Sequence, residues 1–78
     1  MRELIEYIAL ALVDDPSKVY VAQNRRGPNT QFVLRVAKED MGRVIGKQGR
    51  IANAIRLLLN VAAAQEGRRA ILDIEEPR

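Results

Sequence analysis

Two glycines in the middle of the chain, Gly46 and Gly49, separate two patterns that are both typical of helices. After them, apolar residues recur about every 3.6 positions over Arg50–Gln65, which predicts the longest helix of the chain. Before them, a short helix over Glu39–Ile45 is expected to end at Gly46, because glycine readily adopts the positive φ found at helix C-termini. The chain must therefore hold two helices around a tight loop that is bounded by glycine.

The other segments predict one more helix and three strands. Apolar spacing predicts a helix over 2–13, and Pro16 follows it closely. Alternating patterns predict strands over 19–25, 31–37 and 70–75, and a turn cluster within 24–30 joins the first two as a hairpin. The order is α-β-β-α-α-β, and a right-handed crossover places the last strand parallel to the second. We therefore expect one α+β domain over 1–78, with a three-stranded mixed sheet, the second strand central, and three helices on one face.

The long helix has a broad apolar sector. Its predicted buried stripe comprises Ile51, Ala54, Ile55, Leu58, Val61 and Ala62, with Leu57 and Leu59 at its flanks. Its polar face comprises Asn53, Arg56 and Asn60. A helix that packs on both a sheet and another helix needs such breadth, and so does one that contacts a second subunit. The sequence leaves both interpretations open.

The residue inventory excludes several classes of function. The 78 residues allow one small domain and include neither cysteine nor histidine. Disulfides and thiolate metal sites are thereby excluded, and the commonest general base is missing, so we expect no catalytic residues, no metal and no cofactor. The longest uncharged run, nine residues over Leu57–Gln65, is too short to span a bilayer. Since the start shows no secretory leader, we expect a cytoplasmic protein without membrane contact.

Positive charge gathers around the glycine-bounded loop. The net charge is only +3, but the segments 18–38 and 41–56 contain basic residues and no acidic ones. The helix that begins at Arg50 directs free N–H groups and its positive dipole end toward the loop, where Lys47 and Arg50 add charge and Arg43 lies one helical turn away. This combination favours a phosphate group, with Ile45 and Ile51 as neighbouring apolar surface. An ordinary solvated, glycine-capped connection is the alternative.

The loop resembles that of a known family of nucleic-acid-binding domains. Gly46-Lys47-Gln48-Gly49, preceded by Val44-Ile45 and followed by Ile51 and Ile55, resembles the GXXG loop of a KH domain. The order of elements resembles the type II arrangement. Over essentially its whole length, the chain is similar to the KhpA family of small stand-alone bacterial KH proteins.

The resemblance implies a set of RNA-binding residues. They are Arg43, Val44, Ile45, Gly46, Lys47, Gln48, Gly49, Arg50, Ile51, Arg68 and Arg69. In such domains the GXXG loop clamps about four nucleotides by their backbone. Arg68 and Arg69 lie in the loop before the last strand and would form the opposite wall of the groove. Val33 and Arg35 on the central strand are weaker candidates, and core packing is favoured over base contact for the isoleucines around the loop.

The resemblance also implies a biological role. It implies a single-stranded RNA-binding protein that acts as an RNA chaperone or post-transcriptional regulator, with single-stranded DNA left open as a ligand. Its partners would be a second copy, or a second KH-containing protein of the KhpB type. Its role would lie in peptidoglycan homeostasis and cell-length control. The alternative is a KH-shaped adaptor that dimerises or associates with the ribosome and contacts nucleic acid only weakly.

Overall fold

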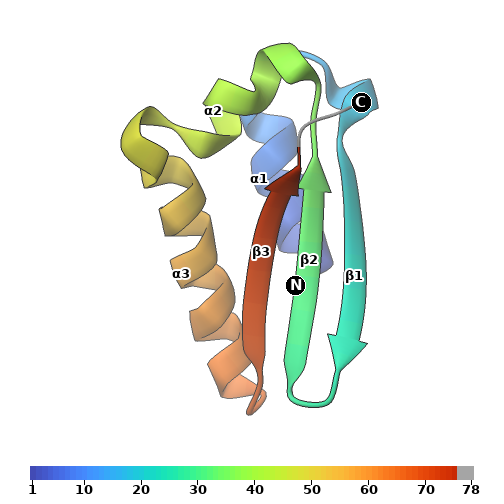
Figure 1. Ribbon diagram of the computed structural model, residues 1–78, viewed down its shortest axis with the longest axis vertical. Coiled ribbons are helices and arrows are strands. Elements are labelled where there is room, and N and C mark those ends of the chain that lie inside the picture. Colours follow the sequence, from blue (N-terminus) through green and yellow to red (C-terminus); the bar gives the residue numbers. More distant parts are fainter. Residues whose placement is uncertain (76–78) are drawn as a thin grey trace.

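The computed structural model describes residues 1–75, which form three α-helices and three strands (Figure 1). The helices are α1 (Arg2–Leu12), α2 (Met41–Ile45) and α3 (Arg50–Gln65). The strands are β1 (Tyr20–Arg26), β2 (Asn29–Arg35) and β3 (Arg69–Glu75). Short 3₁₀ turns cover Pro16–Lys18, Lys38–Asp40 and Lys47–Gly49. The predicted order α-β-β-α-α-β is therefore confirmed.

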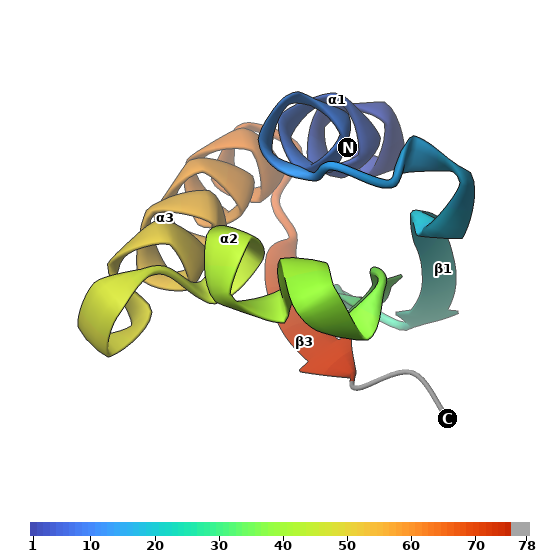
Figure 2. The ribbon, with the colours of Figure 1, turned by 90° about the horizontal axis from the view of Figure 1, so that it is seen from above.

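The sheet is mixed, with β2 in its centre. β1 pairs antiparallel with β2, from Tyr20 opposite Arg35 to Arg26 opposite Asn29. β3 pairs parallel with β2 on the other side. Figure 2, which looks along the strands, shows α1 and α3 on the same side of the sheet. The predicted topology, with the crossover through α2 and α3 returning the chain parallel to β2, is confirmed.

The β1–β2 turn is tighter than the sequence predicts. The ladder runs as far as the pair Arg26 and Asn29, which leaves only Gly27 and Pro28 between the strands. Gly27 provides a positive φ of 58°, which so short a turn requires. β1 consequently begins and ends one residue later than predicted, and β2 begins and ends two residues earlier.

The helix bounds agree with the sequence pattern to within about two residues. α1 ends at Leu12 instead of Val13, and α3 has the predicted bounds. The helix predicted over 39–45 begins as a 3₁₀ turn and is α-helical only over α2. The glycine-bounded loop therefore follows a helix of barely more than one turn, which depends on tertiary contacts for its position.

The core lies between the sheet and the helices. As predicted, Phe32, Leu34 and Val36 face the same way, and all three are buried under the helical layer. From α1, Ile5 and Ala9 reach the same cluster. None of the helices within residues 1–75 lies over the opposite face of the sheet, so β2 follows the pattern of a half-buried strand with alternating inward and outward residues.

The long helix buries a different face from the predicted one. The predicted stripe includes Ala54, Leu58 and Val61, but all three are exposed. Of the predicted stripe, Ile55 is buried, and Ile51 and Ala62 are partly buried. The other buried residues of α3 are Leu59, which was expected at the flank, and Ala52 and Ala63. The helix is turned by about a quarter of a turn from the predicted orientation. As a result, Leu57, Leu58 and Val61 are 67%, 51% and 54% exposed.

Hydrogen bonds to the outer edge of β3 explain this rotation. In the part of the chain that the structure describes, no strand pairs with that edge, and α3 lies beside it (Figure 1). Arg56 Nε donates to the Leu72 carbonyl oxygen at 3.2 Å, and the Ala70 N–H donates to Asn60 Oδ1 at 3.3 Å. Because unpaired backbone groups are costly to bury, the polar side of α3 turns toward the strand. The outer part of its apolar sector is thereby left exposed.

A buried carboxylate joins the end of α1 to the start of α2. Asp40 is 2% exposed and accepts hydrogen bonds from the backbone N–H groups of Asp14 and Asp15, both at 3.1 Å. Arg43 Nε lies 3.5 Å from the same carboxylate, and Arg43 Nη2 lies 2.9 Å from the Asp14 carboxylate. These bonds satisfy two backbone donors and hold α2 in place ahead of the loop.

We expect Asp40→Ala to lower the free energy of unfolding by about 2 kcal/mol, because two backbone N–H groups would lose a charged acceptor. Urea denaturation followed by circular dichroism measures this change. Glu39→Ala is the matched control, because Glu39 is exposed and forms no side-chain hydrogen bond within residues 1–75. Equal midpoints for the two variants would show that the Asp40 carboxylate does not hold α2.

Candidate nucleic-acid interface

The glycine-bounded loop has a backbone that few residues other than glycine adopt. Gly46 has φ 77° and ψ 173°, and Gly49 has φ 77° and ψ 13°. Between them, Gln48 is also left-handed, with φ 58° and ψ 25°. A side chain in this conformation costs about 1–2 kcal/mol. The loop is therefore a true break between α2 and α3, not a continuous helix.

Gly46 also makes the closest backbone approach of the loop. A Cβ atom at this position would lie 2.6 Å from Ile51 Cγ1 and 2.9 Å from the Ile51 backbone nitrogen. A Cβ atom at Gly49 would meet only Asn53 Nδ2, at 3.7 Å. Gly46 is thus required both for its dihedral angles and for the space beside α3, whereas Gly49 is required for its dihedral angles alone.

Two backbone amides in the loop are free. The Gly46 N–H donates to the Gly42 carbonyl at 2.9 Å, and the Gly49 N–H donates to the Gly46 carbonyl at 3.2 Å. Between them, within residues 1–75, the N–H groups of Lys47 and Gln48 have no hydrogen-bond acceptor. These adjacent donors lie at the start of α3, where the helix dipole adds positive potential.

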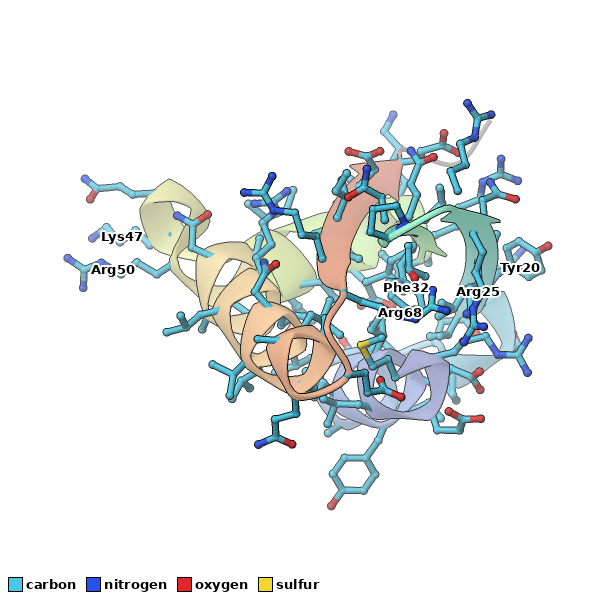
Figure 3. All side chains as sticks on the ribbon, turned by 90° about the horizontal axis from the view of Figure 1, so that it is seen from below. Tyr20, Arg25, Phe32, Lys47, Arg50 and Arg68 are labelled. Atoms are coloured by element: carbon cyan, nitrogen blue, oxygen red, sulfur yellow. The ribbon has the colours of Figure 1, made fainter. Side chains whose placement is uncertain are left out.

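Lys47 and Arg50 add two positive charges at the same place. Both side chains are exposed, and Figure 3 shows them projecting outward from the start of α3. The first turn of α3 contains no acidic residue, and Gly49 provides no side-chain cap. Cations at a helix N-terminus are unfavourable unless an anion offsets them. The position is therefore electrostatically suited to phosphate.

The structure pairs Arg43 with two acidic side chains. Its guanidinium forms ion pairs with Asp14 and Asp40, which lie at the end of α1 and the start of α2. Proximity along the helix had suggested that Arg43 would add to the loop's charge. Asp14 comes from a distant part of the sequence, whereas Asp40 lies three residues before Arg43, and both engage the guanidinium.

The apolar residues around the loop divide into core and surface. Val44 and Ile55 are buried, at 0% and 3% exposure. Ile45 and Ile51 are half-buried and pack against the core from the loop side. Of these four residues, Ile45 and Ile51 present apolar surface near the free amides.

The remaining predicted residues lie away from the loop. Arg68 and Arg69 follow the far end of α3, about 24 Å from its start at 1.5 Å per residue. Val33 and Arg35 point to the sheet face that carries no helix, where Arg35 Nη2 lies 2.9 Å from Glu75 Oε1. The structure therefore gathers Gly46, Lys47, Gln48, Gly49, Arg50, Ile45 and Ile51 into one surface.

Three polar residues of α3 extend this surface toward β3. Arg56 Nη1 donates to Asn53 Oδ1 at 3.2 Å, and Asn60 Nδ2 donates to the Arg56 carbonyl at 2.9 Å. The sequence shows these residues as a polar face but does not show which strand edge they meet. Their spacing of three and four residues was the available signal.

The arrangement is chemically suited to bind an anion through backbone donors and flexible cations. Within residues 1–75, acidic side chains do not gather in threes where they could hold a metal ion. In the same range, no helix is both long and apolar enough to cross a membrane.

Comparisons with a family model and with individual proteins indicate the same family. A family model described as KhpA/KhpB, KH domain, matches residues 2–74. A protein named RNA-binding protein KhpA from Caldanaerobacter subterraneus subsp. tengcongensis is 51% identical over 74 residues, which cover 95% of this chain and 99% of the relative. Proteins of the same name are 47% identical in Clostridium acetobutylicum (95% and 99% covered) and 50% identical in Treponema pallidum (94% and 91% covered). No solved structure matches the chain significantly.

The two loop glycines are expected to differ in their tolerance of alanine. Gly46→Ala should lower the free energy of unfolding by about 3 kcal/mol, because it combines a glycine-only conformation with a backbone clash. Gly49→Ala should cost about 1 kcal/mol, because only its left-handed φ is strained. Thermal melts followed by circular dichroism measure both changes.

Gly42→Ala is the control for this pair. Gly42 lies in α2, has no positive φ, and a Cβ there would meet nothing within 4 Å. Alanine should raise stability at this site by about 0.5–1 kcal/mol. Equal losses at Gly46 and Gly49 would contradict the described loop geometry.

Proposed function

Because the chain belongs to the KhpA/KhpB family of KH domains, we propose that it binds single-stranded RNA through the sugar-phosphate backbone. The loop 46–49 clamps about four nucleotides. The free amides of Lys47 and Gln48 donate to phosphate oxygens, while Lys47 and Arg50 neutralise phosphate charge. Ile45 and Ile51 provide apolar surface for the bases. The protein acts as a binding module without catalysis.

The free amides at the start of α3 support this proposal most directly. They combine unpaired donors, a positive helix end and two exposed cations, with no acid in the first helical turn. A loop that served only to connect two helices would gain stability from an acidic or capping side chain at this position. The sequence instead provides Gln48, Gly49 and Arg50, which favour a bound anion.

Replacing Lys47 and Gln48 with aspartate should separate binding from stability. Two carboxylates at a helix N-terminus should leave the free energy of unfolding unchanged or raise it by about 0.3–1 kcal/mol. Aspartate also tolerates the left-handed conformation of Gln48 better than most residues. RNA affinity should fall at least about tenfold, because carboxylates would face the phosphates. Fluorescence anisotropy with a labelled single-stranded RNA and a parallel thermal melt measure the two effects.

The matched control is Lys18→Asp combined with Gln23→Glu, which lowers the net charge by the same amount at exposed positions near β1. It should retain most of the affinity of the parent. If the loop variant binds RNA as tightly as the parent, the backbone clamp is wrong and the adaptor function is favoured. Comparison of RNA with single-stranded DNA of the same sequence establishes whether the sugar is read.

The exposed apolar part of α3 supports a second function, assembly with another KH domain. Leu57, Leu58 and Val61 are each more than half exposed and lie on the side of α3 that faces neither β3 nor the core. We propose that a second copy of this chain packs its α3 against this surface, and that a KH-containing partner of the KhpB type competes for it. Paired domains would bind longer RNAs with higher avidity than one domain.

Charge introduced on this surface should prevent self-association. Leu58→Glu combined with Val61→Glu should raise the dimer dissociation constant at least about tenfold without lowering the stability of the monomer. Leu10→Glu is the control, since Leu10 is also exposed, at 47%, but lies on α1. Sedimentation equilibrium over a concentration series measures the constant. A monomeric parent protein would remove the proposed homodimer and leave the partner to be sought by affinity capture with a KhpB-type protein.

The cellular part of the proposal derives from family membership. We propose that the protein acts in the cytoplasm as an RNA chaperone or post-transcriptional regulator, and that it influences peptidoglycan homeostasis and cell length together with its KhpB-type partner. Cell length in a deletion strain, complemented by the parent or by the aspartate variant of the loop, tests this role. Complementation by both would separate the cellular role from RNA binding and favour the adaptor.

A further inference from the structure

We propose a second phosphate-binding surface at the far end of α3, which rests on the proposed RNA binding and extends it. Four arginines form this surface, and we call it the arginine cluster: Arg25, Arg26, Arg68 and Arg69. Arg25 and Arg26 end β1, Arg68 lies between α3 and β3, and Arg69 is the first residue of β3. Its ligand is the backbone of the same single strand of RNA that the loop 46–49 holds.

Hydrogen bonds join the two segments that carry these arginines. The Arg69 N–H donates to the Pro28 carbonyl at 3.0 Å, and Arg68 Nη1 donates to the Gly27 carbonyl at 3.5 Å. The β1–β2 turn and the α3–β3 loop therefore lie side by side, although some forty residues separate them in the sequence. Residues that look like two unrelated basic pairs in the sequence become one surface.

The strand register places the arginines on both sides of the sheet end. Arg26 and Arg69 are both aligned with Asn29 in the ladder, so they occupy one row on the face without helices. Arg25 points to the opposite face. Figure 3, which views this end of the molecule, shows Arg25 and Arg68 at the end of the sheet, well away from Lys47 and Arg50. The cluster thus surrounds the end of the sheet.

Within residues 1–75, the cluster forms no ion pair with an acidic side chain. Arg2, Arg35 and Arg43 each form an ion pair, whereas none of the four clustered arginines does so within residues 1–75. Glu66 is the only acid in the two joined segments, 24–30 and 66–70, and it forms no ion pair in the same range. Four positive charges on the two joined segments raise the local positive potential, which favours a bound anion. A phosphate chain provides that anion.

A track free of acidic residues connects the loop 46–49 to the cluster. α3 contains no acidic residue along its length, and Asn53, Arg56 and Asn60 line its side toward β3. The acids of β3 point to the other face, where Asp73 Oδ2 accepts from Gln31 Nε2 and Glu75 pairs with Arg35. Among the described residues, a strand that leaves the loop along α3 therefore meets no negative side chain over the roughly 24 Å of the helix.

The test compares short and long RNAs. Fluorescence anisotropy is measured with single-stranded RNAs of about four and about ten nucleotides, since the loop alone holds about four. For the parent protein, the longer RNA should bind at least about tenfold more tightly, and its affinity should fall more steeply with salt, by about 0.7 per additional neutralised phosphate on a log–log plot.

Arg25→Glu combined with Arg26→Glu should remove this difference. The variant should bind the short RNA like the parent and lose the gain for the longer RNA. Lys18→Glu combined with Lys38→Glu is the control, because it changes the net charge equally at exposed positions outside both surfaces. The milder Arg25→Gln with Arg26→Gln serves if the charge reversal unfolds the hairpin, as judged by circular dichroism.

The outcomes separate this proposal from the RNA-binding proposal. If the parent binds neither RNA, RNA binding itself is wrong. If the parent binds both RNAs with equal affinity and equal salt dependence, the loop alone binds RNA and the arginine cluster is overturned. Equal losses in the cluster variant and the lysine control would also overturn the cluster, because net charge would then account for the effect. If the cluster variant binds the longer RNA as tightly as the parent does, the cluster does not bind RNA and the proposal is overturned. An acidic protein would then be the favoured ligand of the cluster.

Discussion

The hydrogen bonds between α3 and the open edge of β3 determine which side of α3 faces the strand and which side faces solvent. Arg56 and Asn60 supply partners for the Leu72 carbonyl and the Ala70 N–H, which no strand within residues 1–75 satisfies. To reach them, α3 must present its polar side to the strand. This rotation directs Leu57, Leu58 and Val61 outward and leaves the acid-free side of the helix along β3. One local requirement of backbone pairing thus sets both the candidate assembly surface and the candidate RNA track.

The loop ahead of α3 depends on a second constraint, the absence of a side chain at Gly46. With any Cβ there, the loop would have to move away from Ile51, and the free amides would move with it. Asp40 acts on the same loop from the other side, because its carboxylate fixes α2 against the end of α1. The short helix α2 has too few internal hydrogen bonds to position the loop by itself. The Asp40 hydrogen bonds and the close packing at Gly46 therefore position the loop, as a longer helix would otherwise do.

Much of this architecture can be predicted from local patterns, and the exceptions share a cause. The glycine spacing, the apolar periods and the alternation of β2 are local signals, and they predict the loop, the helices and the inward residues Phe32 and Leu34. The exposed side of α3 could not be predicted, because it depends on an edge of β3 formed later in the chain. Arg43 shows the same limit. Its spacing relative to Gly46 favours the loop, but Asp14 approaches it from α1. The contact between the β1–β2 turn and the α3–β3 loop likewise could not be predicted, because the two segments meet only when β3 has paired with β2.

The division of α3 into three lengthwise sectors has a geometric consequence for an assembled pair. Its core sector, its sector beside β3 and its outward apolar sector do not overlap. A twofold axis that passes through the outward sector at right angles to α3 would therefore leave both proposed RNA tracks accessible, and it would make them run in opposite directions. Two such tracks could hold complementary strands with the antiparallel polarity that base pairing requires. The pairing of strands would then follow from the symmetry of the protein pair, with no need for either domain to recognise a particular base.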